Sequence, residues 1–251
     1  MSRSVQSAHD VAHPGVVRIT LDDTQNANAL SPELLVQLDE ALKTACSEAA
    51  RAIVLQSSGT RFCAGFGLSD IDQVDDATLA ARFVAVETML ERVRRAPALT
   101  IALVNGVAMG AGADLVAACD YRIGTARARL GFPGSRFGVI LGTRHLTGLI
   151  GGQQARETLI EGKMLDANAA RANGLLSELC ELERLDARVD EVLASALEFD
   201  PETLRTLLRL TRQSASDNDV EELRRSTARK GLAERMRAHT RKVLPAKAKE
   251  S

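Results

Sequence analysis

The stretch NGVAMGAGADLVAACD, residues 105–120, is the most informative part of this chain. It is almost free of charge and contains three glycines, yet it carries one early carboxylate, Asp114, three residues after Ala111. The run before it, residues 99–104, is apolar on both faces, as in a strand that is covered on both sides of a sheet. The pattern therefore predicts a buried strand, a glycine turn and a buried helix with an acid in its first turn.

A second segment has the same organisation. RFCAGFGLSDID, residues 61–72, follows a short apolar strand that is predicted at residues 52–56. Glycine turns of this kind leave backbone N–H groups without partners and direct them outward. Two such turns that meet at one point could stabilise a carbonyl oxygen as it becomes an oxyanion.

Asp114 has two interpretations from its spacing. It lies one helical turn from Ala111, close to the expected oxyanion, where its carboxylate could transfer a proton. Alternatively, it only caps the N-terminus of a helix that Gly110, Ala111 and Gly112 allow to pack tightly on a sheet. The residues themselves leave both interpretations open.

The rest of the chain favours an α/β fold. Alternating apolar residues predict a strand at residues 16–21, and strands and helices then alternate through the first half of the chain. A strand is expected near residues 121–124, and helices at residues 31–45, 78–95, 166–173, 185–197, 201–214 and 217–241. From about residue 245 the sequence PAKAKES predicts a frayed tail.

Composition excludes several classes of protein. The 251 residues suit one large domain or a domain with an appendage, and a net charge of −1 gives no reason to expect nucleic acid or an anionic membrane as a partner. The four cysteines form no CxxC pair, so we expect no metal site, no disulfides and a cytoplasmic location. Residues 98–119 could span a bilayer by length, but Asp114 would be unpaired there, which favours a buried strand and helix.

Four segments occur in an order that is typical of one family. They are TQNANAL (24–30), RFCAGFGLSDID (61–72), IALVNGVAMGAGADLVAACDYRIGT (101–125) and LIEGKMLDANAARANGLLSEL (159–179). Together they resemble the crotonase superfamily, the enoyl-CoA hydratase/isomerase group, over roughly residues 16–197. The resemblance implies a crotonase-like spiral of repeated ββα units at residues 1–196 that binds a CoA thioester. It also implies a C-terminal helical region at residues 197–251 for assembly into a homotrimer or a dimer of trimers.

The resemblance further implies a set of site residues. The oxyanion would be bound by the backbone N–H groups of Phe66 and Ala111, and Asp114 takes the position of the family's first catalytic glutamate. The residues expected to bind the CoA part of the substrate are Ala27, Arg61, Ala64, Gly65, Gly67, Leu68 and Gly110. Coenzyme A would enter only as part of an acyl-CoA thioester, with no permanently bound cofactor, which implies a place in fatty acid metabolism.

The chain departs from the family pattern at three positions. Phe66 stands where a small residue is usual, Gly67 replaces the usual aspartate, and Gly134 stands where hydratases carry a second glutamate. The two carboxylates of a hydratase share acid and base duties, and losing one lowers the rate by about 10²–10⁴-fold. The polar side chains that could fill the space at Gly134 are those of Ser135, Arg136, Arg144 and His145.

These observations lead to one prediction of function and two alternatives. We predict an acyl-CoA thioester-processing enzyme, a lyase or isomerase, that stabilises a thioester enolate in a backbone oxyanion hole with a modified acid–base set. The first alternative is a decarboxylase or hydrolase of the same fold. The second is an acyl-CoA-binding protein with impaired catalysis.

Overall fold

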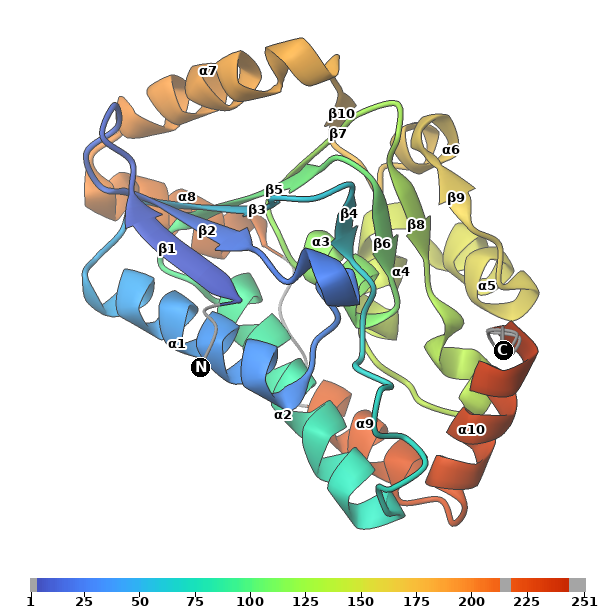
Figure 1. Cartoon of the computed structure of the whole chain (residues 1–251). Coiled ribbons are helices and arrows are strands. Elements are labelled where there is room, and N and C mark those ends of the chain that lie inside the picture. The colour runs from blue at the N-terminus through green and yellow to red at the C-terminus, as the bar shows by residue number, and fades with distance from the viewer. Residues whose placement is uncertain (1–3, 213–217, 244–251) are drawn as a thin grey trace, which may run out of the picture.

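A computed structural model describes residues 4–212 and 218–243, and Figure 1 shows how the elements are arranged. A six-stranded sheet has the strand order β1-β2-β3-β5-β7-β10, and a four-stranded sheet has the order β4-β6-β8-β9. The larger sheet consists of β1 Val5–His9, β2 Val16–Leu21, β3 Ala52–Ser57, β5 Leu99–Val104, β7 Tyr121–Gly124 and β10 Glu178–Leu179. The smaller sheet consists of β4 Arg61–Cys63, β6 Val107–Met109, β8 Arg129–Gly131 and β9 Leu165–Asp166.

The two sheets are built from a repeated pair of strands. β3 is followed by β4, β5 by β6 and β7 by β8, and the second strand of each pair belongs to the smaller sheet. A helix follows β4 and another follows β6, so the chain repeats a ββα unit. Strands β2, β3, β5 and β7 pair in parallel, and β1 is antiparallel to β2. The predicted α/β spiral of ββα units is confirmed.

The helices cover the sheets and extend beyond them. In the first half they are η1 Thr24–Asn26, α1 Pro32–Ser47, α2 Asp76–Arg94 and α3 Ala111–Ala117. In the second half they are η2 Pro133–Phe137, α4 Thr143–Ile150, α5 Gly152–Glu161, α6 Ala167–Ala172, η3 Leu182–Arg184, α7 Leu185–Leu197, α8 Pro201–Thr211, α9 Asn218–Thr227 and α10 Leu232–Val243. Within residues 4–212 and 218–243 no helix combines the length and the apolar character that crossing a membrane requires.

Several helices begin at capping residues that the sequence pattern identifies. The Ser31 hydroxyl accepts a hydrogen bond from the Leu34 N–H (3.1 Å), directly before the proline that opens α1. The Asp166 carboxylate accepts one from the Ala169 N–H (2.8 Å) at the start of α6. Such side chains satisfy N–H groups that have no partner inside the helix. The predicted helices at residues 31–45 and 166–173 therefore start where expected.

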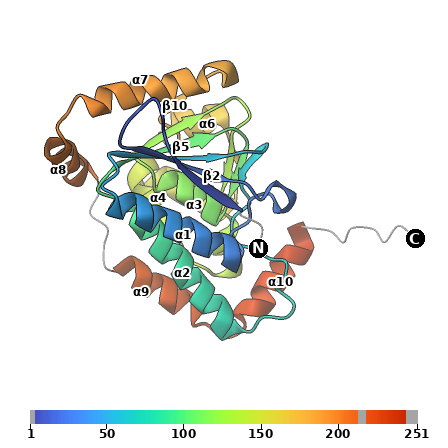
Figure 2. The same ribbon diagram turned by 60° about the vertical axis from the view of Figure 1, so that its left-hand side comes forward.

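The larger sheet is covered on both faces, with α1 and α2 on one side and α7 on the other (Figure 2). Alternate residues of β2 show this directly. Val17 and Ile19 pack in the core formed with α1, α2 and α3, whereas Val16 packs with α7 and α8. Because successive side chains of a strand point to opposite faces, a sheet that is covered twice needs apolar residues at every position. β5 is accordingly buried along its whole length.

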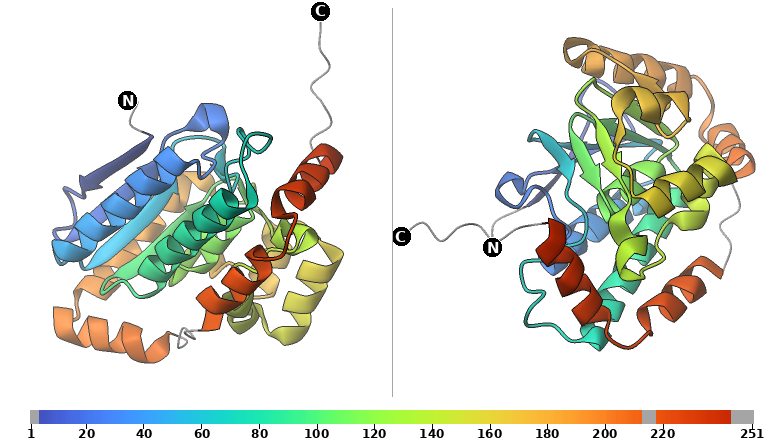
Figure 3. Two further views of the ribbon diagram at one scale, coloured as in Figure 1. Left: turned by 90° about the horizontal axis from the view of Figure 1, so that it is seen from below. Right: turned by 90° about the vertical axis from the view of Figure 1, so that its right-hand side faces the viewer.

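The charged segment that the sequence predicts as one helix at residues 217–241 is two helices, α9 and α10. α9 ends at Thr227, and Gly231, with φ of +79°, directly precedes α10, so the helical run is broken between them. The N–H groups of Gly231 and Ala233 donate to the carboxylate of Asp76, at the start of α2 (2.7 and 2.8 Å). Both helices consequently lie beside α2, as Figure 3 shows.

The C-terminal leucines divide into two groups. Leu193, Leu204 and Leu208 are buried against the larger sheet of their own chain, whereas Leu207 and Leu210 are 44% and 69% exposed. Assembly into a trimer or a dimer of trimers, and a domain limit at residue 196, stay predictions. The tail expected from about residue 245 lies outside the described residues.

Candidate active site

The first glycine turn follows β4 and is held against the segment that precedes α1. The Leu30 N–H donates to the Gly65 carbonyl oxygen (2.7 Å), and the Gly67 N–H donates to the Leu30 carbonyl oxygen (3.1 Å). These two bonds flank Phe66, so the Phe66 N–H points away from Leu30. Within the described part of the chain this N–H meets no backbone acceptor.

The second glycine turn joins β6 to α3. Gly110, with φ of +52°, precedes the helix, and its N–H is fixed to the Gly131 carbonyl oxygen of β8 (2.8 Å). The first hydrogen bond of the helix runs from the Asp114 N–H to the Gly110 carbonyl oxygen (2.9 Å). Ala111, the first helical residue, therefore has an N–H without a partner inside the helix.

The two turns are in direct contact, and glycine makes this possible. A Cβ on Gly65 would lie 2.2 Å from the Met109 carbonyl oxygen and 3.3 Å from the Ala111 nitrogen. A side chain of any kind at position 65 would thus push the turns apart. Phe66 and Ala111 both line one cavity of about 550 Å³, so the predicted pair of oxyanion donors is brought together there.

Asp114 lies in the wall of the same cavity, although it is only 5% exposed. It is the fourth residue of α3, and the capping position is held by Gly110 without a side-chain hydrogen bond. The interpretation of Asp114 as a helix cap is therefore wrong. Gly142, with φ of +62° before α4, packs against the Asp114 carboxylate so closely that a Cβ there would overlap Oδ1. The Asp114 carboxylate occupies the space that a side chain at position 142 would need, so its position requires glycine at 142.

The surroundings of Asp114 disfavour its charged form. Burial raises the pKa of the Asp114 carboxyl well above its usual range, and the Glu87 carboxylate on α2 raises it further. The Arg94 guanidinium, which forms a buried ion pair with Glu87, opposes this with a smaller effect. A carboxyl whose neutral form is favoured in this way is better suited to hold and return a proton than an ordinary exposed aspartate.

Gly134 also lines the cavity and leaves its position without a side chain. A Cβ there would have one close neighbour, the Val139 carbonyl oxygen at 3.4 Å, which is an ordinary contact. Ser135 lines the cavity beside it, and its hydroxyl donates to the Leu159 carbonyl oxygen (3.3 Å). Among the residues that the structure describes, Asp114 is the only carboxylate that lines this cavity.

Arg136 does not fill the space at Gly134. Its guanidinium turns toward the end of α5, where it donates to the carbonyl oxygens of Ile160 (3.1 Å) and Glu161. Arg144 is exposed and is not among the residues that line the cavity in the described ranges. The prediction that either arginine replaces the second glutamate is wrong, because η2 and α4 direct both side chains outward.

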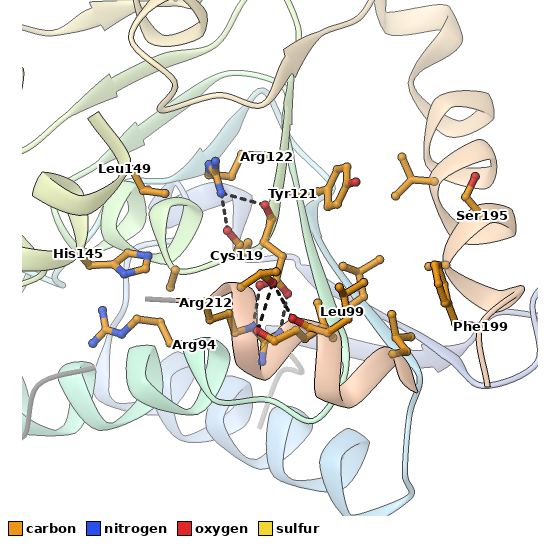
Figure 4. Close-up of a pocket in the computed structure, with 18 of the residues that line it drawn as sticks. Arg94, Leu99, Cys119, Tyr121, Arg122, His145, Leu149, Ser195, Phe199 and Arg212 are labelled. Carbon is orange, nitrogen blue, oxygen red and sulfur yellow. Dashed lines mark hydrogen bonds and ion pairs between the residues drawn. The ribbon is translucent and has the colours of Figure 1, made fainter. Parts of the chain in front are cut away.

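His145 lies on the other side of α3, in a separate cavity of about 520 Å³ between the larger sheet, α7 and α8 (Figure 4). Its Nε2 contacts the Ala117 carbonyl oxygen, and burial, with a smaller contribution from Arg94, lowers its pKa to about 4. His145, one of the four candidates for the space at Gly134, therefore does not line the 550 Å³ cavity in the described ranges. Arg212, in the same cavity as His145, is paired with Asp120 (Figure 4), which fixes the end of α8 to the sheet.

Five of the seven residues predicted to contact the CoA part line the 550 Å³ cavity: Ala27, Arg61, Ala64, Leu68 and Gly110. Gly65 and Gly67 are not among them. Gly67 instead allows the turn to pack closely on the segment before α1, since a Cβ on it would meet the backbone of Leu30 and Ser31 at 3.0–3.1 Å. In the described ranges no three His, Cys, Asp or Glu side chains are placed to hold a metal ion.

Part of the cavity wall was not predicted from the sequence. These residues come from α2, from η2 and the connection to α4, and from α10: Phe83, Phe137, Val139, Leu141, Thr143, Met236, His239 and Thr240. The Phe66 and Phe83 rings stack, with centroids 4.2 Å apart and planes at 18°. The helical spacing of Phe83 indicated that it is buried, but not that it faces a cavity. Helix α10, expected to serve in assembly, contributes to the cavity of its own chain.

Comparisons with known proteins agree with this geometry. Residues 12–244 match the Enoyl-CoA hydratase/isomerase family. The enoyl-CoA isomerase/hydratase of Mycosarcoma maydis is 30% identical over 178 residues, which are 66% of this chain and 65% of that protein. The mitochondrial methylglutaconyl-CoA hydratase of Mus musculus is 29% identical over 194 residues, which are 75% of this chain and 62% of that protein. The chain thus covers less than two thirds of the length of these two relatives.

A solved structure gives a match over nearly the whole chain. The structure from Bordetella parapertussis, assigned to the enoyl-CoA hydratases/isomerases, has a TM-score of 0.91 and 34% identity. It covers 95% of this chain and 98% of the other. By sequence and by fold, the chain belongs to the enoyl-CoA hydratase/isomerase family.

Proposed function

We propose that this protein binds an acyl-CoA thioester in the 550 Å³ cavity and moves a proton along its acyl group, as an enoyl-CoA isomerase does. One observation carries the proposal. Phe66 and Ala111, the two proposed N–H donors, line a cavity in which Asp114 is the only carboxylate among the described lining residues. This arrangement has the parts that a one-base proton transfer needs.

The thioester carbonyl oxygen would accept hydrogen bonds from the two backbone N–H groups. When the Asp114 carboxylate removes a proton from C2 of a 3-enoyl thioester, negative charge develops on that oxygen and the N–H groups stabilise it. The double bond then moves from C3–C4 to C2–C3, and the protonated Asp114 returns its proton to C4. The raised pKa of Asp114 suits both halves of the reaction, because the same group must accept and then donate.

Hydration requires a second acid–base group besides Asp114, the only carboxylate among the described residues that line this site. Adding water across a double bond requires one group to activate the water and one to deliver a proton, and Gly134 provides no side chain for the second role. Ser135 is the nearest polar replacement, but its hydroxyl already donates to Leu159. The geometry therefore favours isomerisation over hydration.

The test compares the protein with Asp114→Asn on 3-hexenoyl-CoA, following the absorbance of the conjugated 2-enoyl thioester. The amide keeps the size of the carboxylate but cannot accept a proton, so kcat should fall by about 10²–10⁴-fold. Affinity for a saturated acyl-CoA should change little, which would mark an interaction made mainly in the transition state. Full activity of the variant, or faster hydration of crotonyl-CoA than isomerisation by the unaltered protein, would contradict the proposal.

Gly134 also supports a second candidate, an acyl-CoA-binding protein without turnover. Such a protein would bind saturated and unsaturated thioesters alike and would release 3-hexenoyl-CoA unchanged. Prolonged incubation with 3-hexenoyl-CoA separates the two candidates, since proton transfer by Asp114 produces the conjugated 2-enoyl thioester with its own absorbance and binding alone does not.

A further inference from the structure

The lining of the cavity has two chemically different parts, which we take as its two ends. Ala27 and the exposed Arg61 line one end. At the other end is an apolar surface, here called the acyl wall, formed by Phe66, Leu68, Phe83, Val139, Leu141 and Met236. A thioester carbonyl has two substituents, so once its oxygen is held by the two N–H groups, CoA leads to one end and the acyl group to the other. The polar end suits CoA, and the acyl wall suits the acyl group.

The acyl wall is continuous with a hydrophobic cluster. Phe83 of α2, Val139 and Met236 of α10 are each at most 2% exposed and pack in one cluster with α9, while Phe66 and Leu141 pack against it from the cavity side. Phe66 and Phe83 stack face to face, which gives this end a rigid aromatic boundary. Ring packing of this kind removes apolar surface from water, and a polar group of a ligand placed against the rings would find no hydrogen-bond partner in them.

Phenylalanine is concentrated around this cavity. The chain has six phenylalanines, and four of them, Phe66, Phe83, Phe132 and Phe137, line the cavity. A chain that is only 3% aromatic thus places most of its rings around one ligand space. The lining of this cavity is therefore much richer in aromatic rings than the chain as a whole, which suits an apolar ligand group.

The charges near the acyl wall would repel an anion or leave it unpaired. Among the described residues that line the cavity, Arg61 is the only lysine or arginine, and it belongs to the opposite end. His239 lines the cavity, but burial lowers its pKa, with smaller contributions from Arg136 and Lys242, which disfavours the charged imidazolium. The remaining ionisable group among the described lining residues is Asp114, which is an acid and offers no cation to an anionic ligand.

We infer that the site selects an uncharged, apolar acyl group and rejects acyl groups that end in a carboxylate. This inference rests on the proposed acyl-CoA function and names the class of acyl group. A terminal carboxylate in this cavity would lose its water without gaining a cation, and it would share the space with Asp114. Burying an unpaired charge in this way weakens binding strongly, by about 100-fold or more.

The experiment compares two saturated thioesters with five acyl carbons, valeryl-CoA and glutaryl-CoA, by calorimetry with the full chain. They differ only in that the terminal methyl group of one is a carboxylate in the other, and neither requires turnover. We expect the affinity for valeryl-CoA to be at least about 100-fold higher than the affinity for glutaryl-CoA. Equal affinities would overturn the inference and leave acyl-CoA binding intact. If neither thioester binds, the proposed function itself fails.

A pair of variants on α10 tests the electrostatic cause. Thr240 lies one helical turn beyond Met236, lines the cavity and is half-buried, so Thr240→Arg would bring a cation to this end. Glutaryl-CoA should then bind about 10-fold or more tightly than it binds the unaltered protein, and valeryl-CoA should not. Ala238→Arg, on the exposed face of the same helix, adds the same charge without entering the cavity and should change neither affinity. Equal gains for the two variants would overturn the explanation.

Discussion

Replacing Gly65 with alanine should separate the two turns that present the oxyanion donors. Gly65 has φ of +87°, and a Cβ on it would lie 2.2 Å from the Met109 carbonyl oxygen. Cβ contacts under 3.0 Å are essentially never seen, and the Met109 carbonyl oxygen belongs to the backbone and cannot rotate away. The turns would therefore have to part by about 1 Å, a displacement that can cost about 10²-fold in rate when it affects a reacting geometry.

Two effects of Gly65→Ala have different sizes and different readouts. Alanine in a left-handed conformation lowers the free energy of unfolding by about 1–2 kcal/mol, wherever it is placed. Loss of one oxyanion donor lowers kcat by about 10²–10³-fold, or about 2.7–4 kcal/mol of transition-state stabilisation. Since Ala111 N lies only 3.3 Å from the added Cβ, its N–H should be the donor that is displaced. We expect kcat to fall by about 100-fold or more.

The assay is isomerisation of 3-hexenoyl-CoA together with thermal unfolding, and Gly151→Ala is the matched control. Gly151 has φ of +78°, and a Cβ on it would have nothing within 4 Å. Both variants carry the strain of a positive φ, and each kcal/mol of lost stability lowers Tm by about 2–4 °C in a chain of this size, but only Gly65→Ala carries the clash. A folded Gly65→Ala protein with the kcat of the Gly151→Ala protein would refute the assignment of the oxyanion site to these turns.

Three further predictions concern the acid–base set and the CoA end of the cavity. Gly134→Glu should raise the rate of crotonyl-CoA hydration by at least about 10-fold, because it restores a second carboxylate at a position where a Cβ meets only the Val139 carbonyl oxygen, at 3.4 Å. No gain in a folded variant would show that the missing side chain at position 134 is not what limits hydration. Because the pKa of Asp114 is raised in the folded state, its contribution to stability is full below the unfolded pKa and is lost as pH rises through the folded pKa. Asp114→Asn should therefore become more stable relative to the unaltered protein as pH rises. Urea unfolding at pH 5 and pH 8 measures the difference in unfolding free energy, and a difference that does not grow at pH 8 speaks against the prediction. Arg61→Ala should weaken binding of acyl-CoA more than of the matching pantetheine thioester, as measured by calorimetry, if the exposed guanidinium contacts a CoA phosphate; equal losses would remove that contact.

The main elements of the fold could be predicted from local patterns, but the second sheet could not. β2, β3, β5 and β7 follow from apolar runs, and α7 runs over the residues that helical spacing predicts. β4, β6 and β8 were missed because each has three residues, too few to show an alternating pattern. They are strands because the chain turns back beside a neighbouring unit that supplies their hydrogen bonds.

The candidate site was predictable where it depends on backbone and not where it depends on side chains from distant segments. The turns at Phe66 and Ala111 could be located because glycine marks the positions where the backbone takes a positive φ or comes very close to another segment. The surroundings of Gly134 could not be predicted, since Ser135, Arg136 and His145 are close in sequence yet point in different directions. Only the turn of η2 into α4 decides which of them reaches the cavity.

The sequence by itself determined the alternation of the longer strands with helices, the two glycine turns, the buried acid at Asp114 and the missing carboxylate at Gly134. Each of these is a local property, fixed by side-chain period, by the freedom of glycine or by the identity of a single residue. The tertiary structure alone decided that Gly142 makes room for the Asp114 carboxylate, that Glu87 raises its pKa, and that Phe83 and Met236 close the acyl wall. Those contacts join positions that are 27 to more than 100 residues apart, and no local pattern encodes them, because they depend on how the winding of the two sheets brings α2, α3 and α10 to one place.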